Sequence, residues 1–276
     1  MSISLVQALI IALIGYLGFV TTPWILGTLG GWYVLSRPLV AGMVVGLILG
    51  DVKTGIIIGA AIQIVFIALV TPGSAIPANI NAASYIGIPL GLVMVKGGGT
   101  VAAAVALATA VGAVGTILAN AIYAINLFWN HQAAKAIETA DYKKLDLYNY
   151  GGSQLTSFLI LFIPTFLSLY YGQTMASAFI TMFPPDSYVM RIFSVLGALL
   201  PAAGIGILLT FVVSKKLQLV FFLVGFTLVA AVGMNMIGLA IVAVFVVYLY
   251  YTLLSKHKVG TKADDSEFVE AEVNEL

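Results

Sequence analysis

The first 137 residues contain a single acidic side chain, Asp51, in sequence that is otherwise almost entirely apolar. A carboxylate at membrane depth costs ~2.5–3.5 kcal/mol or more, so Asp51 needs a partner, a water-filled cavity or a place at the membrane edge. Charged residues make up 8% of the chain and hydrophobic ones 61%, whereas soluble domains carry about 25% charged residues. We therefore predict an integral membrane protein with an all-α, polytopic fold.

Four apolar segments approach or exceed the length of about 20 residues that a membrane-crossing helix needs. They are residues 5–29, 100–129, 191–213 and 217–251, and the last is long enough to be two segments broken near 233–238. A further segment, 154–171, is borderline, and Pro164 predicts a kink within it. The remaining apolar segments, 39–50, 55–70, 86–95 and 175–183, are too short to span or are interrupted by proline.

Pairs of short, broken apolar segments indicate re-entrant or discontinuous helices, because irregular backbone at membrane depth requires protein or a cavity around it. Residues 71–84 contain two prolines, a glycine and several hydrogen-bonding side chains between apolar flanks. They are predicted to break a helix at membrane depth, although an external loop remains an alternative. The polar candidates in this segment are Ser74, Asn79 and Asn81.

Polar sequence at 130–153 and 255–276 divides the chain into a first membrane half (1–129), a cytoplasmic loop (130–153), a second membrane half (154–254) and a disordered tail (255–276). Both halves contain short broken segments, which would suit two inverted halves. Basic residues such as Lys135 and Lys256 near the membrane segments place the loop and the C-terminus on the cytoplasmic side.

Several classes of function have no residues to support them. The chain has no cysteine and only two histidines, His131 and His257, so a metal centre is not expected. No phosphate-binding glycine loop, cofactor motif or nucleic-acid-binding basic stripe is present. No catalytic residue is predicted, and binding or conduction of a neutral polar solute is favoured over chemistry.

Two polar positions inside the first half are candidates for such a solute. Asp51 with Thr54 could form a hydrogen-bonding or conformational-coupling site, or Asp51 could simply cap the following helix. The amide of Gln63 has only apolar neighbours in sequence and suits sugar hydroxyls, or it joins two helices. The glycines around Asp51 permit close helix packing within the chain or against another subunit; they are Gly42, Gly46, Gly50, Gly55 and Gly59.

The motifs Arg37-Pro-Leu-Val, Leu49-Gly-Asp-Val-Lys-Thr-Gly-Ile, Gly59-Ala-Ala-Ile-Gln and Pro77-Ala-Asn79 together resemble the IIC component of the mannose/fructose/sorbose family of bacterial sugar phosphotransferase systems. Asn130-His-Gln-Ala-Ala-Lys-Ala and Phe221-Phe-Leu-Val-Gly-Phe226 are similar to later stretches of that family. The resemblance covers most of residues 3–255 and is most specific in the first half.

The resemblance implies a sugar permease in the bacterial cytoplasmic membrane that pairs with a IID subunit, in an oligomer, and has two inverted halves with re-entrant hairpins. It also implies that phosphate reaches the sugar from separate cytoplasmic IIA and IIB proteins. Several family members carry Glu at the position of Gln63 and Asp at that of Asn79, so a neutral or N-acetylated hexose is favoured here over an amino sugar. The rival interpretations are a stand-alone ion-coupled transporter, with Asp51 as the coupling carboxylate, and a membrane receptor or structural subunit without a solute path.

Overall fold

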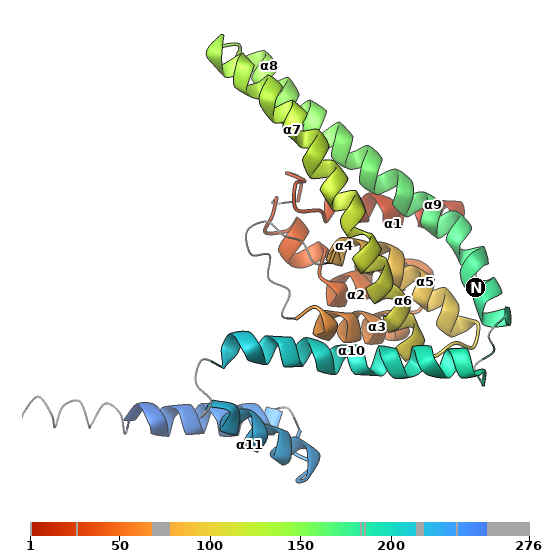
Figure 1. Cartoon of the computed structure of the whole chain (residues 1–276), viewed down its shortest axis with the longest axis vertical. Helices are drawn as coiled ribbons and strands as arrows, with labels where there is room; N and C mark the ends of the chain where they lie inside the picture. The colour runs from red at the N-terminus through yellow and green to blue at the C-terminus, as the bar shows by residue number, and fades with distance from the viewer. Residues whose placement is uncertain are drawn as a thin grey trace, which may run out of the picture. The chain divides into compact units, whose positions relative to one another are not determined.

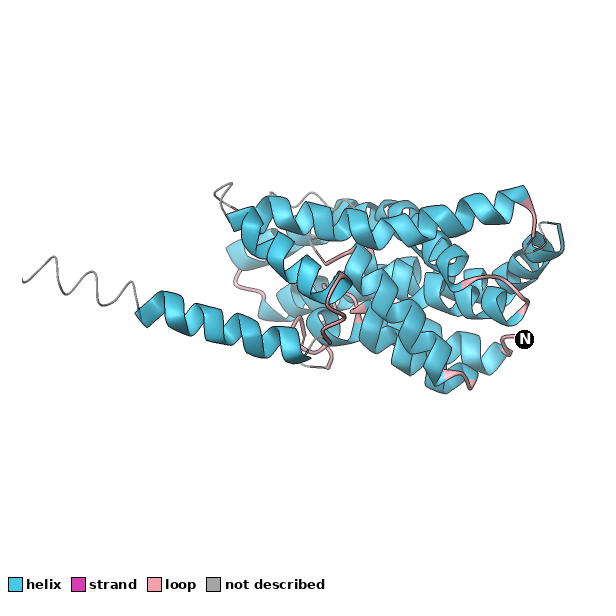
Figure 2. Ribbon diagram, turned by 90° about the horizontal axis from the view of Figure 1, so that it is seen from below, coloured by secondary structure: helices cyan, strands magenta, loops and turns pink. Residues whose placement is uncertain are grey.

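The computed structural model describes residues 2–25, 27–67, 78–182, 184, 186–213, 218–235 and 237–252, and these residues form helices and connections without a β-strand (Figure 1; Figure 2). The predicted all-α class is confirmed. The chain divides into two compact units, Met1–Phe211 and Val212–Leu276, which are described separately.

Among the described residues, three continuous helical stretches are long and apolar enough to cross a bilayer, at Val101–Glu138, Tyr142–Gly172 and Ser194–Val212. The other apolar helices in this part of the chain are shorter than 18 residues, among them α1 (Leu5–Leu17) and α2 (Pro38–Leu49). At 1.5 Å rise per residue, the 12 residues of α2 extend over roughly 18 Å, well short of a hydrocarbon core of about 30 Å. The expectation of short, broken membrane segments is thus met within the described residues.

The first helix is shorter than its apolar sequence predicted. α1 starts with a capping box between Ser4 and Gln7 and ends at Leu17, twelve residues before the end of the predicted 5–29 span. Apolar composition continues beyond Gly18, but Thr21-Thr22-Pro23 is poor helix-forming sequence. After turns, the chain forms a π-helix, η1 (Gly31–Leu35), before α2 begins.

α2 and α3 (Val52–Val65) form a tight helical hairpin in which glycines allow the backbones to touch. A Cβ atom at Gly42 would clash with the carbonyl oxygen of Gly55, and one at Gly46 would lie 2.8 Å from the Cα atom of Val52. The turn between the helices uses Gly50, whose φ of 75° is a left-handed conformation that glycine adopts without strain. The predicted close packing therefore occurs within this chain.

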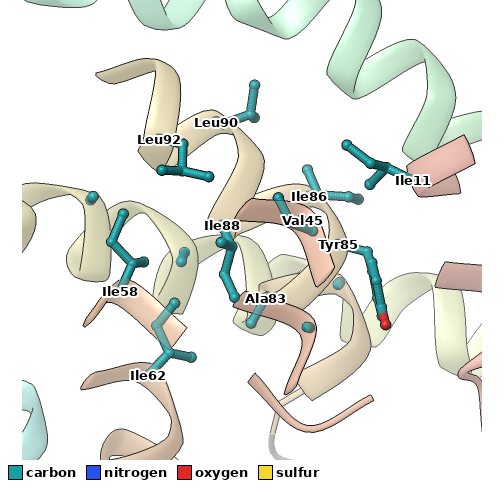
Figure 3. Packing of buried hydrophobic residues seen from close by; sticks show 14 of the residues in the cluster. Ile11, Val45, Ile58, Ile62, Ala83, Tyr85, Ile86, Ile88, Leu90 and Leu92 are labelled. Atoms are coloured by element: carbon teal, nitrogen blue, oxygen red, sulfur yellow. The ribbon is translucent and has the colours of Figure 1, made fainter. Parts of the chain in front are cut away.

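The core of the first unit forms around α4 (Ile80–Ala82), the π-helix η3 (Ala83–Gly87) and α5 (Ile88–Lys96). Figure 3 shows Tyr85 and Ile88 among side chains from α1, α2 and α3. Nearly every residue of this broken segment is buried, including Leu92 at 0% exposure. Pro89 lies in the first turn of α5, directly after the π-helix η3.

Long helices make up the rest of the first unit. α6 (Val101–Val114) and α7 (Thr116–Glu138) are separated at Gly115, and α8 (Tyr142–Asp146) with the π-helix η4 (Leu147–Gly152) leads into α9 (Ser153–Met182). Most of the segment 130–153 is therefore helical, with a turn between α7 and α8. α9 passes through Pro164 without ending, so the short segment predicted at 175–183 is the end of a longer helix.

The second-half helices include α10 (Tyr188–Val212) and α11 (Leu219–Ala230). The predicted break near 233–238 is confirmed: α11 ends at Ala230 and the next helix covers Ile237–Thr252. Gly233 is left-handed, with φ of 72°, and the Asn235 Oδ1 atom accepts from the N–H of Gly238 at 2.7 Å. The turn thus pairs a left-handed glycine with a capping side chain, as Gly50 and Asp51 do between α2 and α3.

Candidate functional site

Asp51 is tied at both carboxylate oxygens. Oδ1 accepts from the backbone N–H of Thr54 at 3.1 Å and caps α3, while Oδ2 lies 3.6 Å from the ammonium nitrogen of Lys96 at the end of α5. The Thr54 N–H lowers the pKa of Asp51, aided by the hydroxyl of Thr54 and the charge of Lys96. The partner that this isolated carboxylate requires is thus a lysine 45 residues away, which the local sequence did not indicate.

Gln63 lies in the last turn of α3, and its side-chain carbonyl oxygen is buried without a hydrogen-bond partner among the described residues. A buried carbonyl that has lost its water and gained no donor costs roughly 1–3 kcal/mol. The site can therefore accept a hydrogen bond from a donor such as a hydroxyl group. The contact between Gln63 and sugar hydroxyls that the sequence predicts stays a prediction.

Asn79 is 2% exposed and uses both ends of its amide inside the protein. Oδ1 accepts from the N–H of Ala82 at 3.1 Å and caps α4, while Nδ2 donates to the carbonyl of Gly115 at 3.0 Å. Its backbone N–H also donates to the carbonyl of Gly112 at 2.8 Å. Asn79 therefore fastens the broken segment to the junction of α6 and α7.

Asn81 is 3% exposed and does not cap a helix; it crosses to α1 instead. Nδ2 donates to the carbonyl of Gly15 at 2.8 Å and to the hydroxyl of Ser36 at 2.9 Å. The Ser36 hydroxyl in turn donates to the carbonyl of Gly18 at 2.7 Å. This amide joins the end of α1, the start of α2 and the broken segment in one buried network.

Two further side chains of η3 join the same network. The hydroxyl of Ser84 donates to the carbonyl of Ser36 at 3.0 Å, and that of Tyr85 donates to the carbonyl of Leu35 at 2.7 Å. The π-helix η3 is thereby connected to the π-helix η1. π-Helical turns are uncommon and are frequent at functional sites, and these two were not predicted from the sequence.

The candidate residues fall into two groups. Gly112 lies between the end of α3 and Asn79, since a Cβ atom there would be 3.3 Å from Phe66 Cζ and 3.4 Å from the Asn79 carbonyl oxygen. Gln63, one turn before Phe66, therefore lies at the end of α3 that is near Asn79. Asn81 follows Asn79 two residues later. Asp51 and Thr54 lie at the opposite end of α3, and Asp51 is roughly 18 Å from Gln63 along the helix axis. Ser74 lies outside the described residues.

A second-half helix also reaches the Gln63 end of α3. A Cβ atom on Gly204 of α10 would lie 2.6 Å from the carbonyl oxygen of Val65, so the two backbones touch there. Earlier in α10, the Ser194 hydroxyl is 2.7 Å from that of Thr100, the residue that caps α6. α10 therefore contacts the first half at two points (Figure 1).

A cavity of about 1040 Å³ lies elsewhere, between α5, α6, α7 and α9. Its lining is almost entirely apolar, with Ser168 and Tyr171 among the few polar side chains, and it includes none of the candidate residues. Such a lining does not suit a sugar, whose hydroxyls require hydrogen-bonding groups. Within the described residues no cluster of three or more His, Asp or Glu side chains could hold a metal ion.

Comparison with known proteins identifies related chains. The family model described as "PTS system sorbose-specific iic component" matches residues 5–249. The sorbose-specific EIIC component of Klebsiella pneumoniae is 27% identical over 217 residues, which is 79% of each chain. The fructose permease IIC component of Bacillus subtilis (strain 168) is 26% identical, over 83% of this chain and 84% of that one. The mannose-specific EIIC component of Escherichia coli (strain K12) is 23% identical, over 84% and 85%.

Two solved structures share the fold at 20% sequence identity, each aligned over 91% of this chain and 97% of the other. One is described as a membrane protein and superimposes with a TM-score of 0.71. The other, with a TM-score of 0.52, comes from a cryo-electron microscopy structure of the mannose transporter ManYZ with microcin E492. These likenesses support the helical membrane fold described above.

Proposed function

The chain belongs to the family of sorbose-specific IIC components of sugar phosphotransferase systems, and we propose that it binds its sugar at the end of α3 that carries Gln63. It is the membrane permease subunit of such a system, as the family match over residues 5–249 establishes. The observation that carries the proposed site is the buried carbonyl oxygen of Gln63, which has no partner among the described residues. A sugar hydroxyl is the donor that this oxygen lacks.

The neighbouring amides support the same location. Asn79 and Asn81 hold the broken segment in place through buried hydrogen bonds, so they shape the site even where their donors are already used. Asp51 and Thr54 act from the far end of α3 by fixing its start. Ser74, in the same broken sequence, is a further proposed contact.

The substrate is proposed to be a neutral or N-acetylated hexose. Gln63 and Asn79 are amides, which donate and accept hydrogen bonds but provide no negative charge to pair with an ammonium group. The relatives named above act on sorbose, mannose or fructose by their descriptions.

The partners follow from the family. We propose that a IID subunit completes the membrane complex, in an oligomer, and that IIA and IIB proteins on the cytoplasmic side supply the phosphoryl group to the sugar. The solved structure of the mannose transporter ManYZ in complex with microcin E492 shares this fold. We also propose that the segment 130–153 and the C-terminus both face the cytoplasm of a bacterial cell, since this segment carries Lys135, Lys143 and Lys144.

Sugar uptake by cells that express the chain with or without a IID subunit tests this function. We expect uptake of D-mannose, D-fructose, L-sorbose or N-acetyl-D-galactosamine that requires both the IID subunit and phosphoenolpyruvate-dependent phosphorylation. Vigorous uptake by the chain alone in vesicles without phosphoenolpyruvate would instead support a stand-alone ion-coupled transporter. Binding of a protein ligand without any sugar uptake would support a receptor.

A further inference from the structure

The turn between α5 and α6 carries a side-chain contact at each of its ends. Lys96, the last residue of α5, reaches Asp51 with 3.6 Å between Nζ and Oδ2. Thr100, which caps α6, contacts Ser194 of α10. Three glycines connect these two residues, and the middle one, Gly98, has φ of 100°, a conformation that other residues rarely adopt.

The backbone of Lys96 is fixed because the helix that ends with it is buried. Leu92 and Val93, in the preceding turn, are 0% and 1% exposed. Lys96 itself is the only basic residue of the last turn of α5, and its side chain is 32% exposed. The core thus delivers one ammonium group to the start of α3, where Asp51 is the single acidic residue of the first 137 positions.

We propose that Lys96 is a positioning residue for transport. Through its contact with Asp51, Lys96 holds the start of α3 against the turn of three glycines between α5 and α6. It therefore sets the rate of transport more than the affinity for sugar. This inference rests on the proposed function. Lys96 lies beside the start of α3, roughly 18 Å from Gln63 at the other end of that helix. It therefore does not touch a sugar bound at Gln63. A partly exposed ion pair at this distance is weak, which allows it to break and re-form during a transport cycle.

The test is a double-mutant cycle in cells that express the chain with its IID subunit. Asp51→Asn removes the charge but keeps a side-chain oxygen that can cap α3. Lys96→Met removes the ammonium group, and Lys96→Arg restores a positive charge. Lys53→Met is the matched control, because Lys53 is an exposed lysine in the first turn of α3 and has no ion pair among those described. Initial uptake of the four sugars named above, divided by the amount of folded complex in the membrane, gives the maximal rate and the half-saturating concentration for each variant.

We expect Lys96→Met to lower the maximal rate about three- to fivefold, with the half-saturating concentration changed less than twofold, and Lys96→Arg to restore most of the rate. The double variant Asp51→Asn with Lys96→Met should be no slower than the slower single variant, because both remove the same contact. Additive losses, or a Lys96→Met variant that matches Lys53→Met, would overturn the proposal. If the proposed function itself is wrong, the unaltered complex will show no sugar uptake, which is a different result.

Discussion

The side-chain amide of Asn79 donates a hydrogen bond to the backbone carbonyl of Gly115, at 3.0 Å. Gly115 separates α6 from α7, so one side chain fastens the broken segment of the first half to the joint between two long helices. The close fit at this joint is visible at Gly115 itself, where a Cβ atom would clash with Ala82. The proposed sugar site thus lies next to a junction of the broken segment with α6 and α7.

Asn79→Leu is expected to destabilise the protein. It removes the cap of α4 and the donor to Gly115, and each buried group left without a partner costs about 1–3 kcal/mol. The melting temperature of the purified complex should fall by several degrees. Asn120→Leu, on an exposed position of α7, is the control and should leave the melting temperature nearly unchanged; equal melting temperatures for both variants would contradict the assigned role of Asn79.

Unlike Asn79→Leu, Gln63→Leu is expected to lower sugar uptake without lowering the melting temperature. The variant removes a buried acceptor that has no partner among the described residues, so the melting temperature should stay the same or rise slightly. Sugar uptake should fall at least tenfold, which corresponds to about 1.4 kcal/mol. Gln63→Glu keeps an acceptor oxygen and adds a charge, so comparison of these two variants separates hydrogen bonding from charge. Normal uptake by folded Gln63→Leu would place the site elsewhere.

Gly204→Ala is expected to separate α10 from α3 and lower sugar uptake, since the added methyl group would press against the backbone of Val65 at 2.6 Å. Gly206, two residues later on the same helix, has open space where a methyl group would go. Gly206→Ala is therefore the matched control and should transport normally. Similar uptake by both variants would show that the contact between α10 and α3 is not needed for transport.

Acid should weaken the cap on α3. Because its hydrogen bonds lower the pKa of Asp51 below the ordinary value of about 3.9, the stability contributed by this carboxylate is present above about pH 4 and is lost as the pH falls through the lowered value. Melting temperatures of the unaltered complex and of Asp51→Asn, compared from pH 7 to pH 3, isolate this effect from other carboxylates. The difference between the two should shrink at the acid end, and a constant difference would refute it.

Much of this arrangement was predictable from the sequence because the signals are local. Gly50 with Asp51, and Gly233 with Asn235, combine a left-handed glycine with a capping side chain, so both helix breaks could be predicted. The burial of the Gln63 carbonyl oxygen agrees with its apolar neighbours in sequence. The end of α1 at Leu17 was missed because an apolar run does not reveal where turn residues interrupt it.

Contacts between distant residues could not be predicted in the same way. Nothing near Asp51 indicates that Lys96 is its partner, and nothing near Asn81 indicates that its amide reaches the carbonyl of Gly15 on α1. The approach of Gly204 to Val65 depends on how two helices pack, which a single sequence does not specify. These long-range contacts give the candidate site its shape.

The most direct test of the proposed permease site is sugar-dependent thermal stabilisation of the purified complex with its IID subunit. A ligand that binds the native state raises the melting temperature as its concentration increases. We predict that one or more of D-mannose, D-fructose, L-sorbose and N-acetyl-D-galactosamine stabilises the unaltered complex, and that Gln63→Leu abolishes the shift while folding normally. An undiminished shift in Gln63→Leu, or no shift with any of these sugars in the unaltered complex, would contradict a sugar site at this end of α3.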